Sequence, residues 1–189
     1  MKPLNQWSTT QKIVLSTAVI FVIFAIVKRG KIYTYYKNMT NELYLQGLHP
    51  LARPIFESFI KEVKEKTGID LIFTSGNRSF KEQAILKQKD SKNASAGNSM
   101  HNFGMAGDFN GFKDGKDILK KATPAKEWKP VVDIAKSMGL FWGGDLKGYA
   151  DNVHFDLRNK YTLASLKSLA LAQYGSDPNK VQGNKLKIA

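Results

Sequence analysis

Two stretches, Ser99-Met-His101-Asn-Phe-Gly104-Met-Ala106-Gly-Asp108 and Asp151-Asn-Val-His154-Phe155, decide how this chain is interpreted. They contain two of its 3 histidines, so composition alone does not account for them. Two imidazoles and one carboxylate form a divalent-metal site with an open fourth position, as a hydrolytic zinc ion requires. The sequence therefore predicts that His101, Asp108 and His154 bind a metal, with zinc as the leading candidate.

The segments around these stretches predict helices interspersed with short strands. Apolar runs favour strands at 69–74, 103–109 and 155–157. Apolar residues at helical spacing favour helices at 51–67, 79–88, 130–138 and 162–174. The first turn of the second helix has a capping box, Ser79-Phe-Lys-Glu82, and residues 90–98 have the composition of a loop. We therefore expect an α+β fold in which a small antiparallel sheet, flanked by helices, presents the site.

The motifs resemble those of the LAS-type (M15) zinc peptidoglycan peptidases, a family that includes VanY-type carboxypeptidases and L-alanyl-D-glutamate endopeptidases of phage endolysins. The resemblance covers about residues 46–156. It implies a Hedgehog/DD-peptidase-like fold. The similar segments are Ser-x-His-x-x-Gly-x-Ala-x-Asp at 99–108, the acidic residue three before His154, Thr74–Ser79 followed by Glu82-Gln83, Gly47–Pro50 and Trp142–Gly144. The chain departs from the family pattern at Asn77, where an aromatic residue is more usual.

Catalytic and substrate-binding roles follow in part from chemistry and in part from the resemblance. Asp151 is the candidate general base, which would take a proton from the attacking water and pass one to the leaving amine. The resemblance implies the same role. An aspartate at position 151, where a glutamate is the alternative, resembles the endolysin endopeptidases more than the dipeptidases. Arg78 offers a planar fork of donors for a substrate carboxylate or a developing oxyanion. Gln83 and Ser99 are substrate-binding candidates by resemblance only.

Other interpretations of these and nearby residues stay open. Asp108 could be a turn or cap residue, Asp151 an ordinary turn former and Arg78 a surface arginine. His49, before Pro50, is favoured as a helix-entry residue over a fourth ligand. The remaining residues near the motifs are expected to have structural roles: Asp145 in a loop, Asp156 supporting the ligands, and Trp142 packing beneath the site in preference to a sugar platform.

Length and composition narrow the class of protein. At 189 residues, the chain can form one domain with a sizeable core plus an appendage. It has no cysteine, which excludes disulfides and thiolate metal sites. The net charge of +13 would attract nucleic acid, anionic membranes or an anionic cell wall. Because the basic residues are dispersed and form no nucleic-acid-binding motif, we expect no nucleic-acid partner.

The N-terminal segment predicts a membrane anchor. Residues 8–27 are uncharged except for Lys12, and would form a helix of about 30 Å, enough to cross a bilayer core. Trp7 flanks one end, and basic and tyrosine residues flank the other. No convincing cleavage site follows, which disfavours a signal peptide. The predicted organisation is an anchor at 1–30, a stalk at 31–45, a zinc peptidase domain at 46–174 and a basic, flexible tail at 175–189.

The predicted function is hydrolysis of an amide bond in peptidoglycan stem peptides by a membrane-anchored zinc peptidase of the phage-lysin type. L-Ala–D-Glu endopeptidase activity is favoured over D-Ala–D-Ala carboxypeptidase activity. A non-catalytic wall-binding or virion component is the alternative from another class. The flanking positive charges slightly favour a cytoplasmic domain, whereas the substrate requires one that faces the wall, and we follow the substrate.

Overall fold

The computed structural model describes residues 29–114, 116–177 and 179–188. The chain divides into two compact units, residues 1–39 and 40–189, and the predicted site residues all belong to the second. The membrane anchor predicted at 8–27 lies outside the described residues. Within the described ranges, no helix is both long and apolar enough to cross a membrane.

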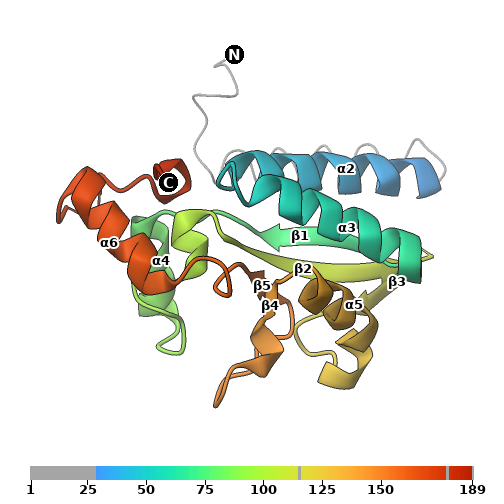
Figure 1. The fold of residues 1–189 in the computed structure, drawn as a ribbon. Helices are drawn as coiled ribbons and strands as arrows, with labels where there is room; N and C mark the ends of the chain where they lie inside the picture. The colour runs from blue at the N-terminus through green and yellow to red at the C-terminus, as the bar shows by residue number, and fades with distance from the viewer. Residues whose placement is uncertain (1–28, 115, 178, 189) are drawn as a thin grey trace. The chain divides into compact units, whose positions relative to one another are not determined.

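The second unit is built around an antiparallel sheet, as predicted (Figure 1). The strands are hydrogen-bonded in the order β1-β2-β5-β4, and β3 also pairs with β2. Their bounds are β1 Asp70–Ser75, β2 Ala106–Lys113, β3 Lys116–Leu119, β4 Phe141–Trp142 and β5 His154–Asp156. The α+β class is therefore confirmed.

The described residues also form helices and short 3₁₀ turns. Their bounds are α2 Arg29–Gly47, α3 Arg53–Thr67, α4 Phe80–Lys89, α5 Ala125–Ser137 and α6 Leu163–Tyr174, with 3₁₀ turns η2 Met100–Phe103, η3 Gly143–Asp145 and η4 Gly183–Lys185. The predicted capping box is present at the start of α4, where Ser79 Oγ accepts from the Glu82 backbone N–H. Helix α3 ends at Gly68 in the left-handed conformation, as its sequence predicts.

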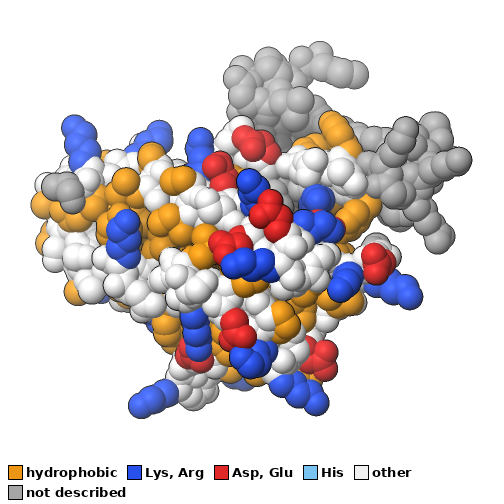
Figure 2. All heavy atoms as spheres, turned by 45° about the vertical axis from the view of Figure 1, so that its right-hand side comes forward, with side chains coloured by type: hydrophobic (Ala, Val, Ile, Leu, Met, Phe, Trp, Pro, Cys, Tyr) orange, Lys and Arg blue, Asp and Glu red, His pale blue; other side chains and the backbone are white. Residues whose placement is uncertain are grey.

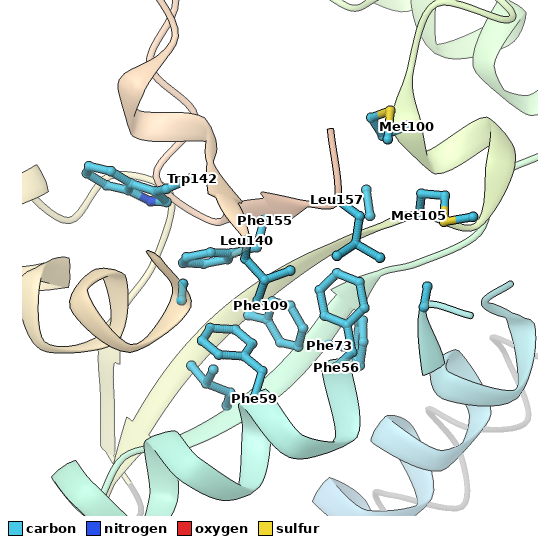
Figure 3. Close-up of a cluster of buried hydrophobic side chains, with 14 of the residues drawn as sticks. Phe56, Phe59, Phe73, Met100, Met105, Phe109, Leu140, Trp142, Phe155 and Leu157 are labelled. Carbon is cyan, nitrogen blue, oxygen red and sulfur yellow. The ribbon is translucent and has the colours of Figure 1, made fainter. Parts of the chain in front are cut away.

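Alternation along β2 and β5 separates the core from the site. Successive side chains of a strand point to opposite faces of the sheet. Phe109 and Phe155 lie on the face covered by α3, where Phe59 contacts both rings (Figure 3). Their neighbours Asp108 and His154 consequently point to the other face. The apolar face fixes the register, and the register sets the positions of the polar residues.

Three local predictions were inaccurate. The strand expected at 103–109 begins at Ala106, because η2 occupies the residues before it, and β3 and β4 were not foreseen. Helix α5 begins at Ala125, so Pro130 lies inside the helix and not at its start. Proline there leaves the Lys126 carbonyl without its helical partner, but Lys126 and Pro130 are both exposed, so water can satisfy that group.

The segment predicted as a stalk is helical, and the predicted tail is more ordered than expected. Residues 29–47 form α2, and within the second unit Asn41 hydrogen-bonds to Leu71 O and Phe73 N of β1. Residues 175–188 were expected to be loose because they are polar and basic. Instead, Leu186 is buried, and its carbonyl oxygen lies 2.8 Å from Nε2 of the buried His49.

Gly183 allows this C-terminal segment to pack closely against the turn that carries His101, because a glycine has no Cβ atom. A Cβ atom on Gly183 would lie 1.8 Å from the Asn102 backbone oxygen, so Gly183→Ala must displace one of the two backbones. We expect the free energy of unfolding to fall by about 2–3 kcal/mol. Gly47→Ala is the matched control, since its Cβ would meet only Asn77 Cβ at 3.9 Å. Urea unfolding should show little loss for the control; equal losses would contradict this account.

Candidate metal centre and active site

His101, Asp108 and His154 converge on one point. Asp108 on β2 and His154 on β5 are directly opposed in the antiparallel register, which brings their side chains together. His101 reaches the same point from η2. His101 Nε2 lies 3.1 Å from Asp108 Oδ1 and 3.2 Å from His154 Nδ1. Asp108 Oδ1 and His154 Nδ1 are 2.9 Å apart. These three residues are a possible metal-binding group, as the sequence predicts.

The donor atoms suit a tetrahedral ion. Zinc binds imidazole nitrogen and carboxylate oxygen at about 2.0–2.2 Å, which places neighbouring ligand atoms about 3.3 Å apart in a tetrahedron. The separations of 2.9–3.2 Å are close to that value. The set contains nitrogen and oxygen but no sulfur, which fits zinc. Three protein ligands leave a position for water or substrate.

Hydrogen bonds on the far side of each imidazole fix its orientation. His101 Nδ1 lies 2.7 Å from Gly76 O, and His154 Nε2 lies 2.8 Å from Asp156 Oδ2. Each outer nitrogen can therefore carry the proton and donate it, while the inner nitrogen is left to bind metal. Asp156 follows His154 by two residues on the same strand, so both side chains share a face. The expected supporting role of Asp156 is consistent with this contact.

Charges around the ligands shift their pKa values. Burial lowers the pKa of His154, but hydrogen bonds and charges from Asp108 and Asp156 outweigh it and raise the pKa to about 9. Burial raises the pKa of Asp108, but His101 and His154 outweigh it and hold the pKa well below its ordinary value. In the metal-free protein, His154 is therefore cationic at neutral pH, and a metal must displace its proton.

Asp151 opens onto the same cavity as the three ligands. Its backbone is fixed on both sides, since its N–H donates to Gly143 O and its carbonyl accepts from the His154 N–H. Its Oδ1 atom is buried yet accepts no hydrogen bond from the described part of the chain. Burying a carboxylate oxygen without a donor is costly. Because the Asp151 side chain is 21% exposed and lines the cavity, its carboxylate can accept a proton from a substrate or water there.

Arg78 also faces the cavity, and its donors are held in place. Its Nη1 donates to Gln83 Oε1 at 2.9 Å, its Nη2 donates to Ser75 Oγ at 2.6 Å, and Nη2 lies 3.8 Å from Asp108 Oδ2. The backbone N–H of Arg78 donates to His101 O, so Arg78 is hydrogen-bonded to η2, the 3₁₀ turn that carries His101.

Gln83 and Ser99 line the cavity too, but their polar groups already have partners in the protein. Gln83 is buried, and its Nε2 donates to Ala94 O at 2.7 Å. Ser99 Oγ accepts from the His101 N–H at 3.3 Å. The contacts of Gln83 position Arg78 and the loop at 90–98, and the contact of Ser99 positions η2, which carries His101. Direct substrate binding by either residue stays a prediction.

Comparison with known proteins identifies the family. The chain matches the sequence profile of an M15 peptidase family described as D-alanyl-D-alanine carboxypeptidase over residues 92–157. It is 37% identical over 123 residues to the peptidoglycan L-alanyl-D-glutamate endopeptidase CwlK of Bacillus subtilis (strain 168), covering 58% of this chain and 73% of the relative. The chain belongs to the M15 family of zinc metallopeptidases.

Among solved structures, this M15 peptidase is similar to the L-Ala D-Glu endopeptidase ChiX of Serratia marcescens, with 21% identity, a TM-score of 0.49, and coverage of 72% of this chain and 91% of that one. It is also similar to a point mutant of the vancomycin resistance D,D-pentapeptidase VanY, solved in complex with Zn(II), with 14% identity, a TM-score of 0.45, and coverage of 64% and 78%.

Two neighbouring residues of the M15 peptidase have the structural roles expected of them. His49 lies outside the metal-binding group; its Nδ1 accepts from the Leu51 N–H, so its Nε2 carries the proton that it donates to Leu186 O. Trp142 is buried, and its Nε1 donates to Asn152 O at 2.9 Å, next to Asp151. This contact places Trp142 as a packing residue that supports the loop of the candidate base.

The cavity of the M15 peptidase measures ≈ 830 Å³ and includes residues that the motifs did not predict. Lys121 follows β3, and Tyr149 and Arg158 flank the stretch 151–155 that carries Asp151 and His154. All three line the cavity. Lys121 and Tyr149 lie in irregular segments with no periodic pattern, so the sequence carried no signal for them. Arg158 lies in the turn that follows β5, where its backbone N–H donates to Asp156 Oδ1, so strand alternation gave no signal for it either.

Proposed function

We propose that this chain is a zinc endopeptidase that hydrolyses the L-Ala–D-Glu bond of peptidoglycan stem peptides. The observation that carries the proposal is the buried Asp151 carboxylate oxygen without a hydrogen-bond donor among the described residues, in one cavity with His101, Asp108 and His154. The bond is chosen from the 37% identity to CwlK, whose name specifies that activity. The aspartate at position 151 supports the same choice through the family resemblance.

Each cavity residue has a distinct task in this reaction. His101, Asp108 and His154 would hold a zinc ion, which when bound would supply Lewis-acid polarisation of the scissile carbonyl and would acidify a water molecule. Asp151 accepts a proton from the attacking water and later donates one to the leaving amine. Arg78, anchored by Ser75 and Gln83, stabilises the negative charge that develops on the carbonyl oxygen.

The surface charge fits a large anionic substrate. The chain carries a net charge of +13. On the face drawn in Figure 2, lysine and arginine side chains are scattered among acidic ones and do not form a single patch. Dispersed positive charge favours weak, salt-sensitive attraction to an extended polyanion such as a cell wall.

The activity is tested with the full chain in mild detergent, loaded with zinc and incubated with purified peptidoglycan. Mass spectrometry of the products should show new L-Ala carboxyl ends and D-Glu amino ends that disappear with a chelator. Release of free D-Ala instead would establish D-Ala–D-Ala carboxypeptidase activity, the alternative that the description of the matching family profile favours. Binding without any metal-dependent product would support a non-catalytic wall-binding or virion component.

We further propose that residues 8–27 anchor the enzyme in a membrane, with the catalytic domain facing the cell wall, as in wall lysis of the phage-lysin type. The support is the apolar run between Trp7 and Lys28, whose last fifteen residues, 13–27, carry no charge. Replacing Ile20 and Phe24 with lysine should move the protein from the membrane fraction to the soluble fraction after cell disruption. Persistence of the variant in carbonate-washed membranes would overturn the anchor.

A further inference from the structure

Lys121 lies next to the candidate general base. Its Nζ atom is 3.9 Å from Asp151 Oδ1, which makes it the cation paired with Asp151 among the described residues. Nζ also donates to Tyr149 Oη at 3.2 Å and lies 5.7 Å from the centre of the Tyr149 ring. All three residues line the metal cavity.

The Lys121 ammonium group keeps donor capacity. An ammonium group has three N–H donors, and the hydrogen bond to Tyr149 uses one of them. The distance to Asp151 is too long for a hydrogen bond. Because the Lys121 side chain is 64% exposed, a ligand in the cavity can reach the remaining donors. Tyr149 accepts from Lys121, so its own hydroxyl proton can be donated to a ligand.

The two arginines of the cavity are more fully engaged than Lys121. Arg78 is held by Gln83 and Ser75. Arg158 donates to both carboxylate oxygens of Asp156 and stacks on the Phe141 ring, with Cζ 4.0 Å from the ring centre. Lys121 therefore differs from both, because it combines open donors with a position beside the residue that handles the leaving group.

The proposed substrate favours a cation at this place. In a stem peptide that continues through the γ-carboxyl of D-Glu, the α-carboxyl group is two bonds from the amine released by hydrolysis. Asp151 must approach that amine to protonate it, so the α-carboxylate comes close to Asp151. Two carboxylates repel each other strongly in a partly desolvated cavity, and a cation between them offsets the repulsion.

We propose that Lys121, together with the Tyr149 hydroxyl, binds the free α-carboxylate of the amino acid that supplies the leaving amine. This inference rests on the proposed L-Ala–D-Glu endopeptidase function. Lys121 thereby selects stem peptides whose D-Glu carries a free α-carboxylate over those in which that group is amidated. The neutral amide lacks the negative charge and gains little from the ammonium group.

The test compares two synthetic peptides, L-Ala-γ-D-Glu-L-Lys and the same peptide with the α-carboxyl group converted to a carboxamide. For the wild-type enzyme, kcat/KM should be about five- to tenfold higher on the carboxylate peptide at low salt, since charge-assisted hydrogen bonds at an exposed site have this magnitude. Lys121→Met should remove that preference by lowering kcat/KM on the carboxylate peptide alone, mainly through KM. Lys121→Arg should restore part of it.

Lys120→Met is the matched control. Lys120 is adjacent and pairs with Asp117 at 2.6 Å, but it does not line the cavity, so its loss changes net charge without changing the preference. Equal losses on both peptides in Lys121→Met would overturn the carboxylate-binding role while leaving the endopeptidase function intact. If the wild-type enzyme releases no D-Glu amino terminus from either peptide, the proposed function itself fails.

Discussion

Replacing Asp151 with asparagine should lower kcat for peptidoglycan hydrolysis by about 10³-fold while zinc stays bound. Asparagine preserves the size of the side chain but cannot accept a proton at neutral pH, and general acid–base catalysis contributes about 10²–10⁴-fold. Because Asp151 is outside the metal-binding group, the zinc content measured by atomic emission should stay at one ion per chain.

Asp145→Asn provides the matched control for this prediction. Asp145 is in η3 on the same connection, but its carboxylate pairs with Lys136 at 2.7 Å and is outside the cavity lining. Its loss should leave kcat within about twofold of the wild type, as expected for an exposed ion pair. Retention of wild-type kcat in Asp151→Asn would show that another residue is the general base.

Replacing His154 with alanine should abolish both zinc binding and hydrolysis. The variant loses one of three ligands and the group that Asp108 and Asp156 both contact. Titration with zinc should raise the melting temperature of the wild type, because a ligand that binds only the folded state stabilises it, and should not raise that of the variant. His49→Gln is the control, since His49 contacts Leu51 and Leu186 and should leave zinc binding intact.

The raised pKa of His154 makes both metal binding and stability depend on pH. Zinc needs the neutral imidazole, so its apparent affinity should fall about tenfold for each pH unit below about 9. In the metal-free protein, the stability of the fold depends on pH in the opposite direction. The ionic contacts of protonated His154 stabilise the fold fully below pH 6.5, and this contribution is lost as the pH rises through about 9. Zinc titrations and urea unfolding at several pH values measure the two effects separately.

Local signals in the sequence were sufficient to predict the possible metal-binding group and most helices. His101, Asp108 and His154 were identifiable because metal chemistry restricts the residue types and because histidine is scarce in this chain. The capping box at Ser79 and the left-handed Gly68 were predictable for a similar reason. In each case the physical requirement acts over a few consecutive residues, so it leaves a recognisable pattern.

Long-range pairing decided the rest. Only the antiparallel register of β2 and β5 shows that Asp108 and His154 are opposed, although 46 positions separate them. Only the fold brings Lys121 from the segment after β3 to Asp151 and packs Leu186 against His49. Such contacts depend on how apolar faces bury one another across the whole domain. Long-range packing of this kind leaves no pattern in a few consecutive residues, so the sequence does not predict it. The sequence by itself thus determined the metal-binding chemistry and the family, whereas the tertiary structure alone determined which cation stands beside the candidate base.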